Sequence, residues 1–336
     1  MKKNRALTRI AALGAGLALA ATMAACGSSG GGSGSSKGAG ASGAGSASAS
    51  SGGDTTDYLK TQPGKGKSFI LGDKNFAEQY LLGALYQQAL QAAGYNVTLK
   101  GNLGSSEIAD KALQSGKIDG IPEYTGVIYT ELAKLGDQPK SAAITLAGAT
   151  KYENGRGFAV LKPTPFQDAD GFAVNKSYAE KNGLKTIGDM SKVGSFTYGG
   201  PPENATRFQG VKGLKQAYGL NKIQFKPLTI GTQYQAIDQG KINAIAIFTT
   251  DGQLAGGKYA VLTDTKGIFG FQNVVPVINQ KKLAQMGPAF TAICNKVSSL
   301  LTTSAIIALN KAVQIDQKEP AVVAKAFLQA NGLVKK

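Results

Sequence analysis

Residues 68–94 read SFILGDKNFAEQYLLGALYQQALQAAG, a strand that leads directly into a helix. Ser68 to Gly72 is a short apolar run, which is typical of a buried strand. Asn75 can cap the following helix, and Glu78 stands three residues later in capping-box position. Gly94 is a suitable end for that helix. The stretch predicts one strand–helix unit of an α/β fold.

The rest of the chain repeats this alternation of apolar runs and amphipathic helical stretches. A strand at 118–121 is expected to be broken by Pro122. The last 50 residues are helical by pattern and are expected to pack on the first part of the chain. Further strands are expected near 96–100, 195–198, 223–228, 243–247 and 259–262, with a return strand at 273–279.

A proline-rich segment divides the folded part into two lobes. Lys162-Pro163-Thr164-Pro165 reads as a crossing from the first lobe to the second, and the strand at 273–279 returns the chain. Two lobes joined by two crossings form a hinged clamshell. Ligands of open α/β sheets bind at the carboxyl ends of strands, so the cleft between the lobes is the expected site.

The N-terminus has the features of an export signal. A basic segment with Lys2, Lys3, Arg5 and Arg9 precedes an apolar run that ends in small residues before Cys26. This order is typical of a lipoprotein signal, and it predicts a lipid on the Cys26 thiol. The chain from 27 to 53 is almost entirely Gly, Ser and Ala, which favours a flexible linker. The alternative is an ordinary secreted protein in which Cys26 is incidental.

The composition excludes several classes of function. The chain has no histidine, so Ser-His-Asp and Cys-His catalysis and histidine metal sites are excluded. It has only two cysteines, so no intrachain disulfide can form once Cys26 is acylated, and Cys294 is expected in the core. Of the net charge of +16, four positive charges fall in the signal, which leaves +12. These charges are scattered, so no nucleic-acid partner is expected.

Five motifs occur in an order that is similar to one known family. They are DKNFAEQ at 73–79, NLGS at 102–105, GKID into PEYTG at 116–126, the segment 231–240, and FTTDG at 248–252. Together they resemble the substrate-binding proteins of quaternary-amine ABC transporters, the OpuAC-like group. The resemblance covers about residues 67 to 330. It implies a two-lobed periplasmic-binding-protein clamshell of type II-like architecture.

The resemblance also implies a binding site. A quaternary ammonium has no N–H, so it is bound by the faces of aromatic rings. Tyr124 matches the first tyrosine of the family's cage, and Phe248 matches a second ring. Lys74 and Arg207 match positions that can hold a ligand carboxylate. Two further matches are Gln79 near the cleft and Asp168 beside the cage.

Two positions depart from the family's cage. Asp170 and Gln272 stand where the resemblance leads one to expect tyrosines. An aspartate facing the cleft attracts a cation and repels a ligand carboxylate, which favours a choline-like ligand over glycine betaine. It also allows a ligand outside the quaternary-amine class.

The resemblance therefore implies a lipid-anchored solute-binding protein of an ABC importer, with no enzymatic activity and no cofactor or metal. Its partners are a small quaternary amine, a permease with its ATPase subunit, and the outer face of the cell membrane; we expect a monomer. Alternatives are a different small cation or osmolyte, a sensor lipoprotein without transport, and a carboxylate-based hydrolase. The expected domains are a signal at 1–26, a linker at 27–66, a first lobe at 67–163 and 274–336, and a second lobe at 164–273.

Overall fold

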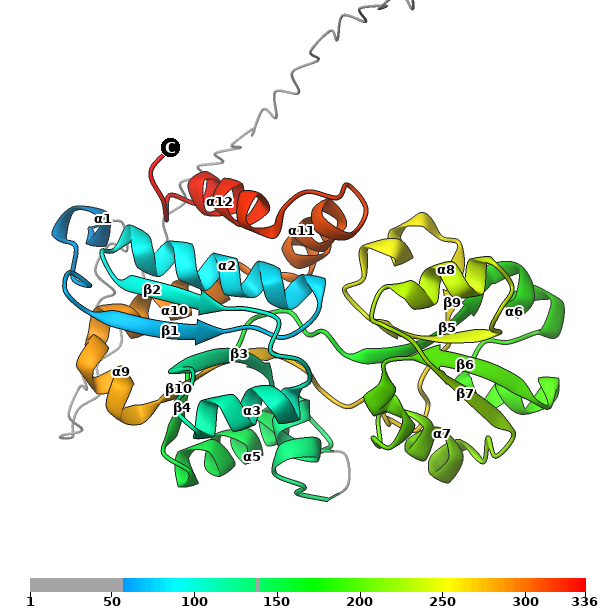
Figure 1. The fold of residues 1–336 in the computed structure, drawn as a ribbon. Coiled ribbons are helices and arrows are strands. Elements are labelled where there is room, and N and C mark those ends of the chain that lie inside the picture. The colour runs from blue at the N-terminus through cyan, green and yellow to red at the C-terminus, as the bar shows by residue number, and fades with distance from the viewer. Residues whose placement is uncertain (1–56, 137–138) are drawn as a thin grey trace, which may run out of the picture. The chain divides into compact units, whose positions relative to one another are not determined.

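The computed structural model describes residues 57–136 and 139–336 (Figure 1). The predicted signal, Cys26 and most of the predicted linker lie outside these residues. Within them the strands form two five-stranded sheets, each with helices packed on it. The lobe that holds the first sheet is called here the first lobe, and the other the second lobe.

The first sheet has the strand order β2-β1-β3-β10-β4. Strands β1, β2 and β3 run parallel, whereas β10 is antiparallel to both β3 and β4. The return strand β10 therefore completes a sheet begun 200 residues earlier, as the sequence predicts. The bounds are β1 Ser68–Gly72, β2 Asn96–Lys100, β3 Gly120–Tyr124, β4 Phe158–Val160 and β10 Val274–Asn279.

Pro122 lies within β3, so the prediction that it breaks the strand is wrong. It stands opposite Pro276 of β10, and the two strands pair on both sides of this position. Both proline carbonyls find donors, because Gln79 Nε2 donates to Pro122 O at 3.1 Å and Leu161 N donates to Pro276 O at 2.9 Å. A proline without a backbone donor fits here because its neighbour across the ladder is also a proline.

The second sheet has the order β7-β6-β8-β5-β9. Its core includes Phe172, which stacks on Tyr198 at 5.1 Å between ring centroids and meets Phe196 edge-on. All four strands predicted here are confirmed, and β5 adds a fifth. The bounds are β5 Asp170–Asn175, β6 Phe196–Gly200, β7 Ile223–Pro227, β8 Ala244–Phe248 and β9 Tyr259–Val261.

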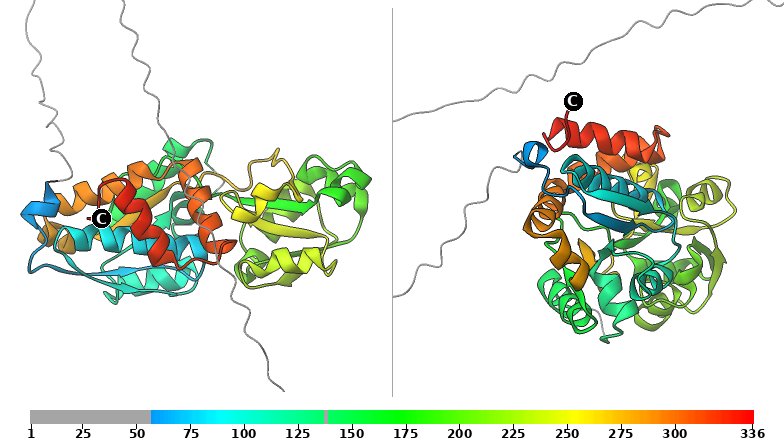
Figure 2. Two further views of the ribbon diagram at one scale, coloured as in Figure 1. Left: turned by 90° about the horizontal axis from the view of Figure 1, so that it is seen from above. Right: turned by 60° about the vertical axis from the view of Figure 1, so that its left-hand side comes forward.

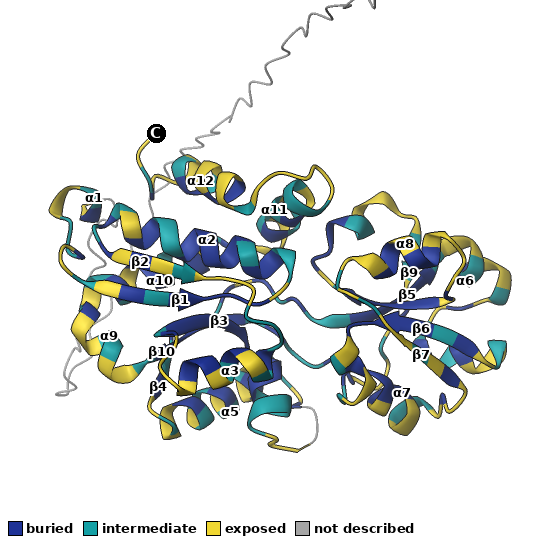
Figure 3. Cartoon of the chain, in the orientation of Figure 1, coloured by how far each residue is buried: buried dark blue, intermediate teal, exposed yellow. Residues whose placement is uncertain are grey.

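Helices cover both sheets, and the buried residues gather where they meet the strands (Figure 3). In the first lobe they are α2 Ala77–Ala92, α3 Ser106–Gln114, α4 Thr125–Val127, the π-helical turn η1 Ile128–Leu132, α5 Ala142–Gly155, α9 Gln280–Met286, α10 Pro288–Leu300, α11 Thr303–Gln314 and α12 Pro320–Ala330. In the second lobe they are α6 Lys176–Asn182, η2 Ile187–Val193, η3 Pro202–Ala205, α7 Val211–Tyr218, α8 Thr232–Asp238 and η4 Gly252–Gly256.

The C-terminal helices pack on the first lobe, as the sequence predicts. Helix α12 lies along α2 (Figure 2), and Cys294 of α10 is buried in the same core. Helix α11 also reaches the second lobe, where Gly252 N donates to Gln314 Oε1 at 2.7 Å. No single helix of the described ranges is long and apolar enough to cross a membrane; the bent pair α10 and α11, at 86°, meets that criterion only jointly.

The chain crosses between the lobes twice, once after β4 and once after β9. The two crossing segments lie side by side, and Gln167 forms an antiparallel bridge with Asn273. Asp168 N donates to Gln272 O at 3.0 Å, directly beyond this bridge. The connection between the lobes is therefore a short two-stranded ribbon.

Two local predictions fail. Residues 57–66, expected to end the linker, contain the helix α1 Tyr58–Thr61, and the Tyr58 hydroxyl donates to Leu333 O at 3.2 Å in the core. Helix α2 has Phe76 as its N-cap residue and no side-chain cap, so Asn75 and Glu78 do not form a capping box. Glu78 is buried instead and bonds to residues of other elements.

Candidate functional site

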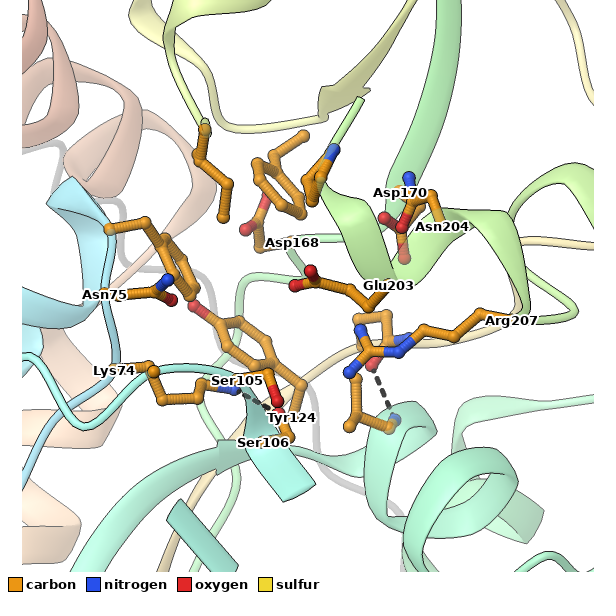
Figure 4. A pocket seen from close by; sticks show the side chains of 17 residues that line it. Lys74, Asn75, Ser105, Ser106, Tyr124, Asp168, Asp170, Glu203, Asn204 and Arg207 are labelled. Carbon is orange, nitrogen blue, oxygen red and sulfur yellow. Dashed lines mark hydrogen bonds between the residues drawn. The ribbon is translucent and has the colours of Figure 1, made fainter. Parts of the chain in front are cut away.

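A pocket of about 510 Å³, partly open to solvent, lies between the two lobes where strands of both sheets end (Figure 4). Lys74 follows β1 and Tyr124 ends β3, while Phe248 ends β8 of the second sheet. The carboxyl ends of strands are the usual place for a ligand site in open α/β sheets.

Three aromatic rings form a stack along one wall of the pocket. Phe76 lies between the other two, with its ring centroid 6.1 Å from that of Tyr124 and 5.5 Å from that of Phe248. Their planes differ by 25° and 14°. The stack joins the lobes, because Phe76 and Tyr124 belong to the first and Phe248 to the second. Aromatic faces of this kind attract cations.

A cation of the protein already lies on this wall. Lys74 Nζ is 4.4 Å from the centroid of the Tyr124 ring, and it donates to Ser106 Oγ at 2.9 Å. It also forms a buried ion pair with Glu123. Burial lowers the pKa of Lys74, and the charge of Glu123 opposes this effect. Because Glu123 compensates the charge of Lys74, Lys74 attracts a ligand carboxylate only weakly.

Arg207 is paired in a similar way, across the two lobes. Its Nη2 donates to both carboxylate oxygens of Glu107 in α3, at 2.8 and 3.0 Å. Partial burial raises the pKa of Glu107, but the Ser105 hydroxyl and the charge of Arg207 outweigh it and lower the pKa to about 2. Arg207 lies in the turn between η3 and α7.

Three carboxyl groups also line the pocket: Asp168, Asp170 and Glu203. Burial raises the pKa of Asp170 to about 7, against the attraction of Arg207. Burial, together with the charge of Glu78, raises the pKa of Asp168 well above its usual value. With Lys74 and Arg207 both paired, a cation bound in the pocket would favour ionisation of these carboxyl groups, so the lining suits a cationic ligand.

Three buried N–H groups of the pocket's lining residues have no hydrogen-bond partner. They are Asn204 Nδ2, Gln272 Nε2 and Arg207 Nε. The other amide atom of Gln272 is used, because Oε1 accepts from Val127 N at 3.1 Å. A buried donor without a partner costs free energy, about 1–3 kcal/mol, so these groups suit a ligand that carries an acceptor oxygen.

The structure brings most of the predicted site residues together. Those that line the pocket are Lys74, Tyr124, Asp168, Asp170, Arg207, Phe248 and Gln272. Gln79 does not line it; its side chain accepts from Lys74 N and donates to Pro122 O, and so supports the ends of β1 and β3.

Sequence reasoning missed several lining residues, among them Phe76, Glu203 and Asn204. Phe76 belongs to the DKNFAEQ motif, but nothing in the motif itself indicates that its ring faces the pocket. Two consecutive prolines, Pro201 and Pro202, were the available signal for a turn that carries Glu203 and Asn204. Within residues 57–136 and 139–336, no three acidic or cysteine side chains are grouped to hold a metal ion.

The fold and the pocket define a class, the two-lobed solute-binding proteins. One solved structure with this fold, a glycine betaine/carnitine/choline ABC transporter protein, is 25% identical, with a TM-score of 0.65 over 79% of this chain and 99% of the other. Another, lactococcal OpuAC with glycine betaine, is 17% identical with a TM-score of 0.58, and covers 80% and 98% of the two chains.

Sequence comparison gives the family. Residues 67–330 match the substrate-binding domain of ABC-type glycine betaine transport systems, and the chain belongs to this family. The glycine-betaine-binding protein of Pseudomonas aeruginosa is 30% identical over 79% of this chain and 88% of its own length. The ergothioneine transport permease/ergothioneine binding protein of Helicobacter pylori is 28% identical over 80% and 48%. The chain is thus a substrate-binding component of an ABC importer, and not an enzyme.

Proposed function

We propose that this chain binds a quaternary ammonium solute in the interlobe pocket and delivers it to a membrane permease. The observation that carries the proposal is the stack of Tyr124, Phe76 and Phe248 beside Asp168. The faces of such rings favour a cation without N–H groups by about 0.5–2 kcal/mol per contact. The relatives named for glycine betaine and carnitine support the same class of ligand.

Choline is the favoured ligand within this class. Lys74 is paired with Glu123, and Arg207 is paired with Glu107. Neither of these two cations of the pocket is therefore free to bind a ligand carboxylate through an unpaired charge. The unpartnered donors of Asn204 and Gln272 can instead bind a hydroxyl oxygen. Glycine betaine is the second candidate, because Arg207 Nε also lacks a partner and could donate to a carboxylate.

Titration calorimetry of the purified protein with choline, glycine betaine, carnitine and proline betaine tests the ligand. We expect choline to bind more tightly than glycine betaine. Absence of binding by all four at millimolar concentration would refute the quaternary-amine assignment. A panel of cationic amino acids and other osmolytes then examines the alternative of a different small ligand.

The proposal includes lipid attachment at Cys26 and a location on the outer face of the cell membrane. It rests on the basic and apolar leader and on the Gly-, Ser- and Ala-rich segment that follows Cys26. Mass spectrometry of the mature N-terminus tests it: a diacylglyceryl group on Cys26 is expected, and a Cys26→Ser variant should lack it. A mature chain that begins elsewhere without lipid would contradict the anchor.

A further inference from the structure

Glu78 connects the two lobes from behind the aromatic stack. Its side chain is only 2% exposed and is not part of the interlobe pocket's lining. Glu78 Oε1 accepts from the Tyr124 hydroxyl at 2.8 Å, and Oε2 accepts from Asn310 Nδ2 of α11 at 2.7 Å. Oε2 also lies 2.6 Å from the hydroxyl of Thr250, which follows β8 in the second lobe. One carboxyl group thus fixes a ring of the pocket and contacts both lobes.

The contacts of Thr250 indicate how many protons Glu78, Thr250 and Asp168 share. Thr250 Oγ1 lies 2.6 Å from Glu78 Oε2 and 2.7 Å from Asp168 Oδ1, and both are hydrogen-bond lengths. A hydroxyl has one proton, so it can donate to only one of the two carboxyl groups. The other short contact needs a proton from the carboxyl itself. Glu78, Thr250 and Asp168 therefore require one carboxyl proton in this arrangement.

Among the described residues no side chain supplies a free cation that could replace this proton. The three residues line a second cavity of about 400 Å³ behind Phe76 and Phe248, together with Asp251. Asp251 accepts from the Tyr234 hydroxyl and from Gln314, and adds further negative charge. Lys74, over the Tyr124 ring, is paired with Glu123, and in the described part of the chain neither Glu78 nor Asp168 forms an ion pair.

Burial acts in the same direction. It raises the pKa of Glu78 and of Asp168, and each group's neighbouring carboxylates raise it further, while hydrogen bonds from Thr250 oppose the change. When the lobes separate, we expect water to reach both groups and their pKa values to fall.

We propose that Glu78, Thr250 and Asp168 hold one proton between the two lobes, taken up from solvent when the lobes close on a solute. Glu78 is thereby a positioning residue, which fixes the Tyr124 ring and also contacts Thr250 of the second lobe. The inference rests on the proposed function in that it concerns closure around the same pocket.

The sign of the pH dependence follows from this arrangement. The proton is bound more tightly in the closed form than in the open form. Closure is therefore most favourable at low pH and weakens as pH rises through the closed-form pKa of the pair. Between the open-form and the closed-form pKa each pH unit should weaken solute binding by up to about tenfold, the limit for one proton, and above the closed-form pKa the loss is complete.

The variant Glu78→Gln removes the need for the proton without changing the shape of the side chain. Its amide can donate to Thr250 Oγ1, which is then free to donate to an ionised Asp168, and Asn310 can turn its unpartnered Oδ1 toward the amide. Thr250→Ser keeps the hydroxyl. Glu153→Gln is the matched control, because Glu153 is also a buried glutamate with a pKa raised by burial to about 7, but it bonds to Arg156 within the first lobe.

The dissociation constants of choline and glycine betaine are measured from about pH 6 to 9. In the wild type, Thr250→Ser and Glu153→Gln they should rise by about tenfold or more over this range, whereas in Glu78→Gln they should change less than about twofold. A wild-type constant that does not depend on pH, or a Glu78→Gln variant that keeps the slope, overturns the proposal.

Carboxyl-carbon NMR separates this proposal from the identity of the ligand. Spectra of the wild-type protein, free and with solute, are assigned with Glu78→Gln and Asp168→Asn. In the solute-bound sample one carbon of the pair should titrate well above its usual range, even if the ligand proves to be outside the quaternary amines. Titration of both carbons below pH 5 in every sample refutes the shared proton.

Discussion

The ion pair between Arg207 and Glu107 should both hold the lobes together and withhold Arg207 from the ligand. Glu107→Gln tests both effects. A hydrogen bond to a charged group contributes about 1.5–3 kcal/mol, and an exposed ion pair about 0–1 kcal/mol. The Glu107 side chain is 42% exposed and that of Arg207 13%, so we take about 1 kcal/mol for the loss. Choline binding should therefore weaken about fivefold.

Glycine betaine should respond differently to the same substitution. Once Glu107 is neutral, Arg207 can donate to the ligand carboxylate, which offsets the lost interlobe contact by about 1–2 kcal/mol. Its affinity should stay within about twofold or increase. The dissociation constant of choline divided by that of glycine betaine should therefore increase.

Titration calorimetry with both solutes measures this ratio directly. Asp238→Asn is the control, because Asp238 pairs with Lys258 at 2.7 Å within the second lobe alone, and it should leave both affinities unchanged. Equal weakening of choline and glycine betaine in Glu107→Gln would show that Arg207 does not reach the ligand. If neither affinity changes, the ion pair between Arg207 and Glu107 does not contribute to the closed form.

Three further predictions follow from the site. Tyr124→Ala and Phe248→Ala should each weaken binding of the preferred solute by about tenfold or more, since each removes an aromatic face; unchanged calorimetric constants would show that the rings do not hold the ligand. Gly210→Ala should destabilise the protein by more than about 1 kcal/mol in thermal unfolding, because a Cβ there would lie 2.1 Å from Asn204 O. An unchanged melting temperature would show that the backbone of this turn can shift to accommodate the methyl group. The contribution of Glu107 to affinity should persist at neutral pH and disappear as pH falls from about 4.5 toward 2, a difference from the Gln variant that calorimetry can follow.

Strand β8 is predicted well because its own residues are apolar and buried on both faces. Residues 244–247 are apolar throughout and fully buried, and the strand needs no distant partner to be recognised. Strand β4, with three residues, was missed, and so was β5, although most of its six residues are buried. Pro122 misled the prediction because its partner Pro276 lies some 150 residues away, and only the folded sheet brings them opposite each other.

In the candidate site, too, local sequence patterns predict some residues but not the contacts that depend on distant parts of the chain. Matching motifs placed Tyr124 and Phe248 correctly in one pocket, although they lie on different lobes. Glu78 fitted a local capping rule, but its real partners come from three other elements. The pairing of Arg207 with Glu107 depends on how the lobes face each other, and no local pattern in the sequence encodes it.

The reach of helix α11 into the second lobe has a consequence for the evolution and engineering of affinity. Gln314 accepts from Gly252 N and donates to Asp251 Oδ1 at 3.2 Å, outside the interlobe pocket. Substitutions there can alter how long the closed form lasts without touching the solute. Selection can therefore adjust release to the needs of a permease while specificity stays fixed. For the design of a solute sensor, the same helix offers a site for changing the working concentration range independently of the recognised compound.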